Sequence, residues 1–254
     1  MNDKFPLMNM WPDYLEWRNR KKLRQIFFSI TPLPIHVWSM IAWETYSSLI
    51  RIFTVFTPLR YRKKKKLFVN IGAGVTEKNG WVNIDIFRFP GINCLYNCKK
   101  KLPFSNDSVR VIHCEHFLEH LDYSEEVPVF ISECFRVLEK DGVLRISVPD
   151  AEKYIEAYLE SGWGALTKIR PLIGEKRDKH IDIEYRTKME LINMVFRTGI
   201  HHKYSYDFDT LKFVLTRYGF SQVYKQAFNT TNVNEGCVDN PLRASESLYV
   251  EAVK

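Results

Sequence analysis

An apolar segment that runs directly into a glycine turn restricts the fold more than any other feature of the sequence. LFVNI (67–71) is followed by GAG (72–74), and the next apolar segment, WVNIDI (81–86), carries Asp85 only eleven residues after Gly74. Glycines at a strand end let a ligand approach the backbone, because a side chain there would collide with it. Nucleotide-binding α/β proteins usually separate the two features by about twenty residues and a crossover helix. The segment is therefore either a ligand site without its first helix or a glycine turn between two hairpin strands.

From residue 67 onward, short apolar segments alternate with helical patterns. Several of these segments are apolar on both faces, as the strands of a buried parallel sheet are. The predicted strands are residues 67–71, 81–86, 91–96, 109–114, 143–148, 221–228 and 247–254, and the predicted helices are 124–142, 150–162 and 207–220. The first of these helices is expected to begin at Ser124 and to end at Gly142. The sequence predicts an α/β fold with a doubly wound, Rossmann-like, mostly parallel sheet of about seven strands.

Charge divides the chain into two parts. Residues 1–66 hold 13 Lys and Arg against 4 Asp and Glu, a net charge of +9, whereas residues 67–254 hold 24 against 26, a net charge of −2. We therefore expect a basic, aromatic, helical appendage over 1–66 and a separate domain over 67–254. The irregular, charged, histidine-rich stretch at about 163–206 is expected to form an inserted cap on that domain. A nucleic-acid partner is not favoured, because the domain lacks net positive charge.

The appendage contains two predicted helices, 13–30 and 35–56, followed by the basic run RYRKKKK (60–66). The second helix is nearly long enough to span a bilayer, but it carries Glu44 and Arg51, which are costly inside a membrane. Two interpretations stay open. The helix either packs on the domain or on a second copy of the chain, or it attaches the protein to an anionic membrane surface.

The cysteines and the N-terminal residues favour the cytoplasm. The five cysteines are odd in number and include no C-x-x-C pair, so a reducing compartment is the simpler interpretation. The first residues carry acids and aromatics and lack the basic and apolar regions of a secretory signal. We expect a cytoplasmic protein, with membrane association left open.

The glycine turn does not fit a dinucleotide. Glu77 occupies the position of the third glycine, and no crossover helix supplies an N-terminus for a pyrophosphate. NAD and FAD are therefore not expected, whereas a ligand without phosphate is compatible with the turn.

Six sequence blocks follow one another in an order that is more specific than any single motif. They are VNIGAG (69–74), GWVNID (80–85), KLPFSNDSVRVIHCEHFLEHL (101–121), ECFRVLEKDGVLRISVPD (133–150), YDFDTLKFVLTRYGF (206–220) and SLYVEAVK (247–254). Together they resemble the class I S-adenosylmethionine-dependent methyltransferases. Within these, the chain resembles the type-11-related group, whose members read GW-N-D directly after the glycine turn and share the LPF and LEHL blocks. The resemblance covers residues 67–254. It implies that members of this group lack the helix between the glycine turn and the next strand.

The resemblance implies S-adenosylmethionine as the cofactor, which needs a close-approach turn and a ribose acceptor but no phosphate cradle. Asp85 resembles the acidic residue that accepts both ribose hydroxyls, and Asn97 stands where the group has an aspartate facing the adenine amine. Asn70 likewise replaces an acidic residue of the wider superfamily. Because an amide binds the adenine amine without charge, a non-catalytic cofactor-binding protein stays open. The implied cofactor-binding residues are Gly72, Ala73, Gly74, Asp85, Asn97, Leu102, Glu115 and His116.

Methyl transfer needs a general base only if the acceptor keeps its proton, since the sulfonium is already an activated leaving group. The candidates for that base are His116, Asp150 and His201. His202 and Tyr204 belong to the same H-x-Y-like element as His201, which either faces the acceptor or forms a surface loop. From the resemblance, we expect a sugar, a lipid-linked saccharide or another small metabolite as the acceptor.

A different chemistry is suggested by His116, Glu119 and His120, which spell H-x-x-E-H. In the inverted zinc-peptidase signature, two such histidines bind the metal and the glutamate activates water. The match lies directly after a strand and inside a methyltransferase block, and five-residue matches arise by chance. A zinc hydrolase therefore stays only as an alternative, and no metal ligands are expected.

Overall fold

The computed structural model describes residues 30, 35–170, 172–174, 176–178, 183–197, 201–232 and 239–254. Contacts within the chain divide it into two compact units, one ending at Ser47 and one running from Ser48 to Lys254. All but the last residue of the predicted helix 13–30 lies outside the described residues.

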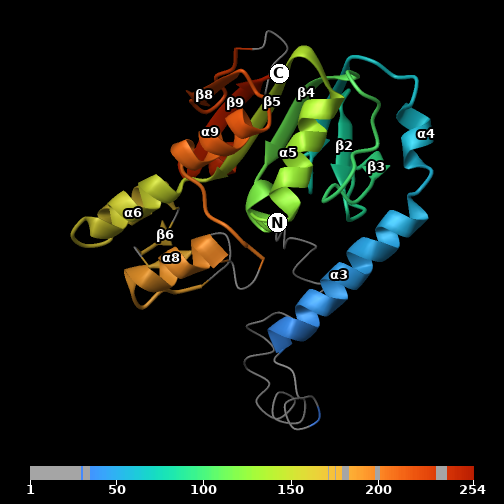
Figure 1. Cartoon of the computed structure of the whole chain (residues 1–254). Helices are drawn as coiled ribbons and strands as arrows, with labels where there is room; N and C mark the ends of the chain where they lie inside the picture. The colour runs from blue at the N-terminus through green and yellow to red at the C-terminus, as the bar shows by residue number, and fades with distance from the viewer. Residues whose placement is uncertain are drawn as a thin grey trace. The chain divides into compact units, whose positions relative to one another are not determined.

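The predicted helix 35–56 is observed as α3 (Ile35–Phe53), and the short α4 (Thr57–Tyr61) follows it (Figure 1). No helix in the described part of the chain is both long enough and apolar enough to cross a membrane. Large apolar side chains are exposed around the end of α3, where Phe53 and Phe56 are 79% and 75% exposed.

The domain is built on a seven-stranded sheet with the strand order β3-β2-β1-β4-β5-β9-β8 (Figure 1). β9 is antiparallel to both of its neighbours, and the other pairs are parallel. The strands are β1 (Leu67–Ile71), β2 (Val82–Asp85), β3 (Cys94–Leu95), β4 (Val109–Glu115), β5 (Leu138–Pro149), β8 (Gln222–Gln226) and β9 (Ser247–Val253). The arrangement confirms the predicted Rossmann-like α/β fold with a mostly parallel sheet of seven strands.

One face of the sheet is covered by α5 (Glu126–Val137) and α9 (Phe208–Arg217), as Figure 1 shows. Alternate residues of the central strands are apolar and fully buried in the main core, because alternate side chains of a strand share one face. They include Val69, Ile71, Ile112, Cys114, Leu144, Ile146 and Val250. Phe135 of α5 packs edge-on against Phe220, which follows α9, with ring centroids 5.3 Å apart. The two helices are thereby joined to one core.

The helix predicted over 124–142 is shorter than expected, and the strand predicted over 143–148 is longer. α5 ends at Val137, and β5 begins at the next residue. Leu138 is fully buried and is paired with Val109 of β4. This pairing places Leu138 in the strand rather than in the helix. The polar residues that follow belong to the first part of β5 rather than to a helix end.

The start of α5 also differs from the prediction, because the Ser124 side chain does not cap it. The Asp122 carboxylate accepts hydrogen bonds from the backbone amides of Ser124 and Glu125, both at 2.9 Å. A carboxylate has enough lone pairs to accept two amides at once, which favours aspartate at this corner.

The connection between β1 and β2, residues 72–81, contains no helix over its fully described length. Two buried asparagines hold it instead. Asn70 Nδ2 donates to the Thr76 carbonyl at 2.9 Å and to Asn83 Oδ1 at 3.0 Å. The Asn83 side chain in turn accepts from the Lys78 amide at 2.9 Å and donates to the Lys78 carbonyl at 3.0 Å. These bonds fix the connection without the crossover helix that most parallel strand pairs use.

A row of polar side chains crosses the opposite face of the sheet. The backbone register aligns Asn83, Asn70, His113, Arg145 and Glu251 across five adjacent strands. All five side chains are buried. Because a buried charge needs a partner of opposite charge, this row requires carboxylates close to the arginine.

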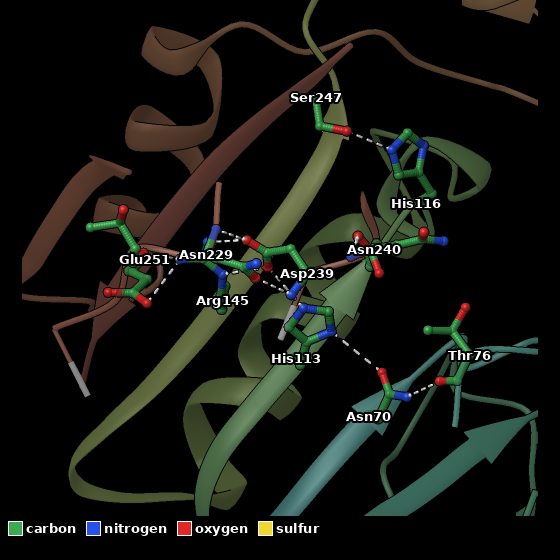
Figure 2. Close-up of polar contacts among 12 residues, drawn as sticks. Asn70, Thr76, His113, His116, Arg145, Asn229, Asp239, Asn240, Ser247 and Glu251 are labelled. Carbon is green, nitrogen blue, oxygen red and sulfur yellow. Dashed lines mark hydrogen bonds and ion pairs between the residues drawn. The ribbon is translucent and has the colours of Figure 1, made fainter. Parts of the chain in front are cut away.

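The partners of Arg145 are Asp239 and Glu251, which Figure 2 shows on either side of it. Arg145 Nε donates to Asp239 Oδ1 at 2.8 Å, and Nη1 donates to Glu251 Oε1 at 3.0 Å. The same Asp239 oxygen lies 3.3 Å from His113 Nε2, and His113 Nδ1 lies 3.4 Å from Asn70 Oδ1. The segment that carries Asp239 is therefore joined through this network to the centre of the sheet.

The described part of the predicted cap consists of short elements with an apolar core of their own. They are α7 (Gly164–Ile169), β6 (Leu172–Ile173), β7 (Arg177–Asp178) and α8 (Lys188–Arg197), which pack with α6 (Ala151–Leu159) around Tyr154, Leu166, Leu191 and Val195. Arg170 connects them to the residue before β9, because its guanidinium donates to Asp178 at 2.8 Å and to Glu246 at 2.6 Å.

Candidate active site

The candidate site lies at the carboxyl ends of β1, β2 and β4. The strand order reverses between β1 and β4, and ligands of open α/β sheets bind outside the strand ends at such a switch point. The turn 72–74 follows β1, Asp85 ends β2, and Glu115 and His116 lie at the end of β4. The fold thus brings most of the residues predicted to bind the cofactor to one edge of the sheet.

The two glycines of the turn serve different purposes. Gly72 and Gly74 both have positive φ angles, +67° and +52°. A Cβ atom on Gly72 would lie 2.9 Å from Phe117 Cδ2, so glycine there lets this ring pack against the turn. A Cβ atom on Gly74 would meet only the Gly72 carbonyl oxygen, at 4.0 Å. The space beside Gly74 is therefore open to a ligand, while the Ala73 amide anchors the turn by donating to Ile84 at 3.0 Å.

The Asp85 carboxylate holds the glycine turn in position. Its Oδ2 accepts from the Gly74 amide at 2.9 Å, and its Oδ1 accepts from the Phe87 amide at 2.8 Å. Burial raises the pKa of Asp85, and these amides partly oppose the rise. Each carboxylate oxygen has a second lone pair. Asp85 can therefore hold the turn and accept two ribose hydroxyls at the same time, which fits S-adenosylmethionine.

Glu115 and His116 are held by residues from outside β4, as Figure 2 shows in part. Glu115 Oε1 accepts from the Asn240 amide at 3.0 Å. His116 Nε2 lies 2.8 Å from Ser247 Oγ, and the His116 amide donates to the Ser147 carbonyl at 2.9 Å. The φ angle of His116 is +48°, in the left-handed region. Such strained residues concentrate at functional sites, so this geometry agrees with a role for His116 beyond packing.

Two further residues predicted to bind the cofactor lie in the connection between β3 and β4. Asn97 Oδ1 accepts from the Lys99 amide at 3.0 Å, and its contact with an adenine amine stays a prediction. Leu102 is buried in the main core, and its amide donates to Glu133 Oε2 at 2.7 Å. Leu102 therefore has a packing role in the structure, and its contact with a cofactor stays a prediction.

The structure explains why position 70 is an asparagine, where the wider superfamily has an acidic residue. The Asn70 side chain donates to the Thr76 carbonyl and to Asn83 Oδ1. A carboxylate has no N–H group, so an acid at this position would place acceptors against acceptors. Asn70 thus stabilises a glycine connection that lacks a helix.

The other two candidates for a general base have structural contacts of their own. Asp150 is 1% exposed and caps α6, since its Oδ1 accepts from the Lys153 amide at 3.4 Å. The Lys153 ammonium lies 3.6 Å from Asp150 Oδ2. His201 is exposed, and its backbone carbonyl accepts from His120 Nδ1 at 3.1 Å. The catalytic roles of Asp150 and His201 stay predictions.

Glu119 and His202 form a cluster that the sequence did not indicate. The short 3₁₀ helix η2 (Leu118–His120) follows β4 and buries Glu119, which is 1% exposed. His116 Nδ1 lies 3.2 Å from Glu119 Oε1, and His202 Nε2 lies 4.0 Å from the same oxygen. The rings of His120 and His202 are 4.7 Å apart and nearly perpendicular. The H-x-x-E-H motif pointed to Glu119, but nothing in the sequence linked it to His202, so far along the chain.

Electrostatics in the cluster favours an ionised carboxylate beside a neutral imidazole. Burial alone would raise the pKa of Glu119, but His116, His120 and His202 lower it to about 2. Burial lowers the pKa of His120 to about 4. At neutral pH, Glu119 is therefore charged, and His120 has a lone pair available.

A narrow gap, without room for a water molecule in this structure, lies beside the cluster. It is lined by Glu119, Pro149, Val195, His202, Tyr204 and Tyr206. Tyr204 is stacked on Tyr123, with ring centroids 4.0 Å apart.

Comparison with protein families gave one match, in which residues 88–146 correspond to a methyltransferase domain of the type-11 group. Comparison with curated proteins gave no match. The matched residues include β3, β4, α5 and most of β5.

Several solved structures are similar to the chain at low identity. An S-adenosylmethionine-dependent methyltransferase from Archaeoglobus fulgidus is 16% identical, with 85% of this chain and 100% of that one covered and a TM-score of 0.44. One from Mesorhizobium loti is 16% identical, with 75% and 92% covered and a TM-score of 0.45. The Burkholderia thailandensis 1,6-didemethyltoxoflavin-N1-methyltransferase, solved with 1,6-didemethyltoxoflavin and S-adenosylhomocysteine, is 14% identical, with 93% and 89% covered and a TM-score of 0.42.

The family match covers β3, β4 and most of β5, and the glycine turn and Asp85 lie before the matched residues at the switch point of the same sheet. Residues 88–146 therefore match a methyltransferase domain of the type-11 group, and S-adenosylmethionine is the cofactor that the glycine turn and Asp85 fit.

Proposed function

We propose that this methyltransferase acts on a small-molecule or saccharide-type acceptor. The proposal rests on the resemblance of the chain to its group and on the aromatic and polar side chains that Tyr204, Tyr206 and His202 place beside the strand ends. The net charge of −2 over residues 67–254 also disfavours substrates with a phosphate backbone.

We assign cofactor binding to the turn 72–74 and to Asp85, with Asn97, Glu115 and His116 at the rim. When bound, S-adenosylmethionine supplies a methyl group on a sulfonium that is already an activated leaving group. The remaining task of the protein is to align the acceptor and to exclude water from it.

For an acceptor that keeps its proton, we assign the general base to His116 ahead of Asp150 and His201. His116 Nδ1 lies 3.2 Å from Glu119 Oε1, so this carboxylate would stabilise a proton taken up by the ring. Asp150 is buried as a helix cap, and His201 is exposed, so neither has comparable support.

We also propose that residues 1–66 attach a cytoplasmic protein to an anionic membrane surface. The net charge of +9 and the lysine run Lys63–Lys66 supply electrostatic attraction, and exposed apolar groups such as Phe53 and Phe56 supply the apolar part. The four cysteines in the described residues are free, which agrees with a reducing compartment. Packing of the same segment against a second copy of the chain is the alternative.

The proposal is tested first by calorimetric titration with S-adenosylmethionine and S-adenosylhomocysteine. Gly74→Val should abolish binding, because the side chain fills the open space beside the turn. Gly80→Val is the matched control, since Gly80 has a φ of +80° in the same connection and also has open space around it. Equal losses in both variants would mean that backbone strain, not a ligand contact, explains the effect.

The acceptor class is tested by measuring S-adenosylhomocysteine release in the presence of sugars, lipid-linked saccharides, small metabolites, RNA and protein. Turnover is expected with a member of the first three classes. Turnover with RNA or protein alone would contradict the proposed acceptor class and leave the cofactor assignment intact.

A further inference from the structure

Three metal-ligating side chains lie close together at η2. They belong to Glu119, His120 and His202. One carboxylate oxygen and one nitrogen from each histidine all lie within 4.8 Å of one another. Ligand atoms that share one ion at about 2.0 to 2.2 Å stand about 3 to 4 Å apart, so small side-chain rotations complete the set. The Glu119 backbone helps to bring the distant segment here, because its carbonyl accepts from the Lys203 amide at 2.7 Å.

Both histidines are oriented as metal ligands are. His120 Nδ1 donates to the carbonyl of His201 at 3.1 Å, and His202 Nδ1 donates to the carbonyl of Val195 at 2.6 Å. A carbonyl oxygen only accepts, so Nδ1 carries the proton in each ring, and the lone pair lies on Nε2. Backbone carbonyls fix the tautomer and orientation of metal-binding histidines in the same way.

The Glu119 carboxylate is buried beside the His116 ring, whose Nδ1 lies 3.2 Å from Glu119 Oε1. It is 1% exposed, and neither of its oxygens receives a hydrogen bond from the described residues. A buried charge without such bonds is unfavourable unless it is paired or coordinates a metal. A divalent ion beside this carboxylate would supply the coordination that its buried oxygens lack in the described residues.

We propose that Glu119, His120 and His202 bind one divalent first-row transition metal ion. Two imidazoles and one carboxylate suit ions such as Zn²⁺, Co²⁺, Fe²⁺ or Mn²⁺, and they leave coordination positions open. The expectation of no metal concerned the H-x-x-E-H motif, in which His116 and His120 would be the two histidine ligands. The set proposed here has His202 in place of His116. Because Glu119 acts here as a ligand, it is not available as the water-activating base of a zinc peptidase.

The open positions of the ion would lie next to the narrow gap that Glu119 and His202 also line, and this gap would have to widen to admit an acceptor. Resting on the proposed methyl transfer, the ion would bind an oxygen of the acceptor and lower the pKa of a hydroxyl there. A hydroxyl, phenol or enol acceptor with a second oxygen nearby fits this arrangement. The released proton could then pass to a weak base such as His116.

The test uses the full-length chain, purified without a histidine tag and stripped with a chelator. Titration with Zn²⁺ by calorimetry, and with Co²⁺ by visible absorption, is expected to show one ion per chain. Glu119→Gln and His202→Ala should each weaken binding by at least about a hundredfold, since even outer-sphere partners of a metal ligand contribute about 10- to 100-fold. His201→Ala is the matched control for metal affinity, because the contact of His201 with His120 is made by its backbone carbonyl, which alanine keeps.

The same samples are titrated with S-adenosylhomocysteine and melted by circular dichroism. Loss of the metal with retained cofactor binding and a retained melting transition supports the site. Absence of cofactor binding in the wild-type chain would contradict the proposed function and leave the metal result standing. The metal proposal is overturned if the wild-type chain binds no ion stoichiometrically, or if folded Glu119→Gln and His202→Ala bind it as the wild type does.

Discussion

Replacing Asp85 by alanine tests the cofactor site most directly. Each carboxylate oxygen already accepts one backbone amide, from Gly74 and from Phe87, and keeps one lone pair for a ribose hydroxyl. Two charge-assisted hydrogen bonds of about 1.5 to 2 kcal/mol each would then be lost. The affinity for S-adenosylhomocysteine should fall by about 3 to 4 kcal/mol, or roughly two to three orders of magnitude.

The assay is calorimetry with S-adenosylhomocysteine, which binds without turnover. Asp209→Ala is the matched control, because Asp209 is an exposed carboxylate in the first turn of α9. Asp85→Asn separates charge from shape, since it keeps one acceptor but turns an N–H donor toward one of the two amides. If Asp85→Ala is folded and binds within about threefold of the wild type, Asp85 is not the ribose acceptor, and the lone-pair argument is wrong.

Three further predictions concern pH, stability and membranes. Burial raises the pKa of Asp85, so its ionised, ribose-binding form is lost as pH falls, starting above the usual range of an aspartate. Calorimetry should therefore show that the cofactor affinity of the wild type declines in acid. A pH profile of affinity identical to that of Asp85→Ala would contradict this. Asp239→Ala leaves the buried Arg145 with one carboxylate partner, so urea unfolding should show a loss of about 3 to 5 kcal/mol, and a loss below about 1 kcal/mol would refute the role of this pair. Replacing Lys63–Lys66 by glutamine should reduce sedimentation with anionic liposomes at low salt, at about 1 kcal/mol per lysine, and unchanged sedimentation would favour the packed-helix interpretation.

Hydrophobic pattern predicted the sheet well, because its strands are buried on both faces. LFVNI (67–71) was predicted with the bounds of β1, and the spacing of the glycine turn indicated a connection without a helix. The start of β5 was missed, because Glu139, Lys140 and Asp141 read as a polar helix end. Only the pairing of Leu138 with β4 places these residues in a strand, and register between distant strands is not a local property of the sequence.

In the candidate site, too, local patterns could be predicted from the sequence and contacts between distant segments could not. Gly74 and Asp85 could be paired from their order, because the carboxyl ends of adjacent parallel strands meet at one edge. His202 could not be paired with Glu119, since the contact depends on how the segment before α9 returns to η2. The structural role of Asn70 could not be predicted either, because it depends on the backbone carbonyl that the side chain faces.

The polar row across the sheet has a consequence for biosynthesis. Its members come from β1 to β9, and Glu251 lies three residues from the C-terminus. While the last strand is still inside the ribosome, Arg145 lacks Glu251, and the face that it occupies cannot close without an uncompensated charge. The nascent chain should therefore stay open until β9 has been made, and a chain cut before Glu251 should remain accessible to proteases.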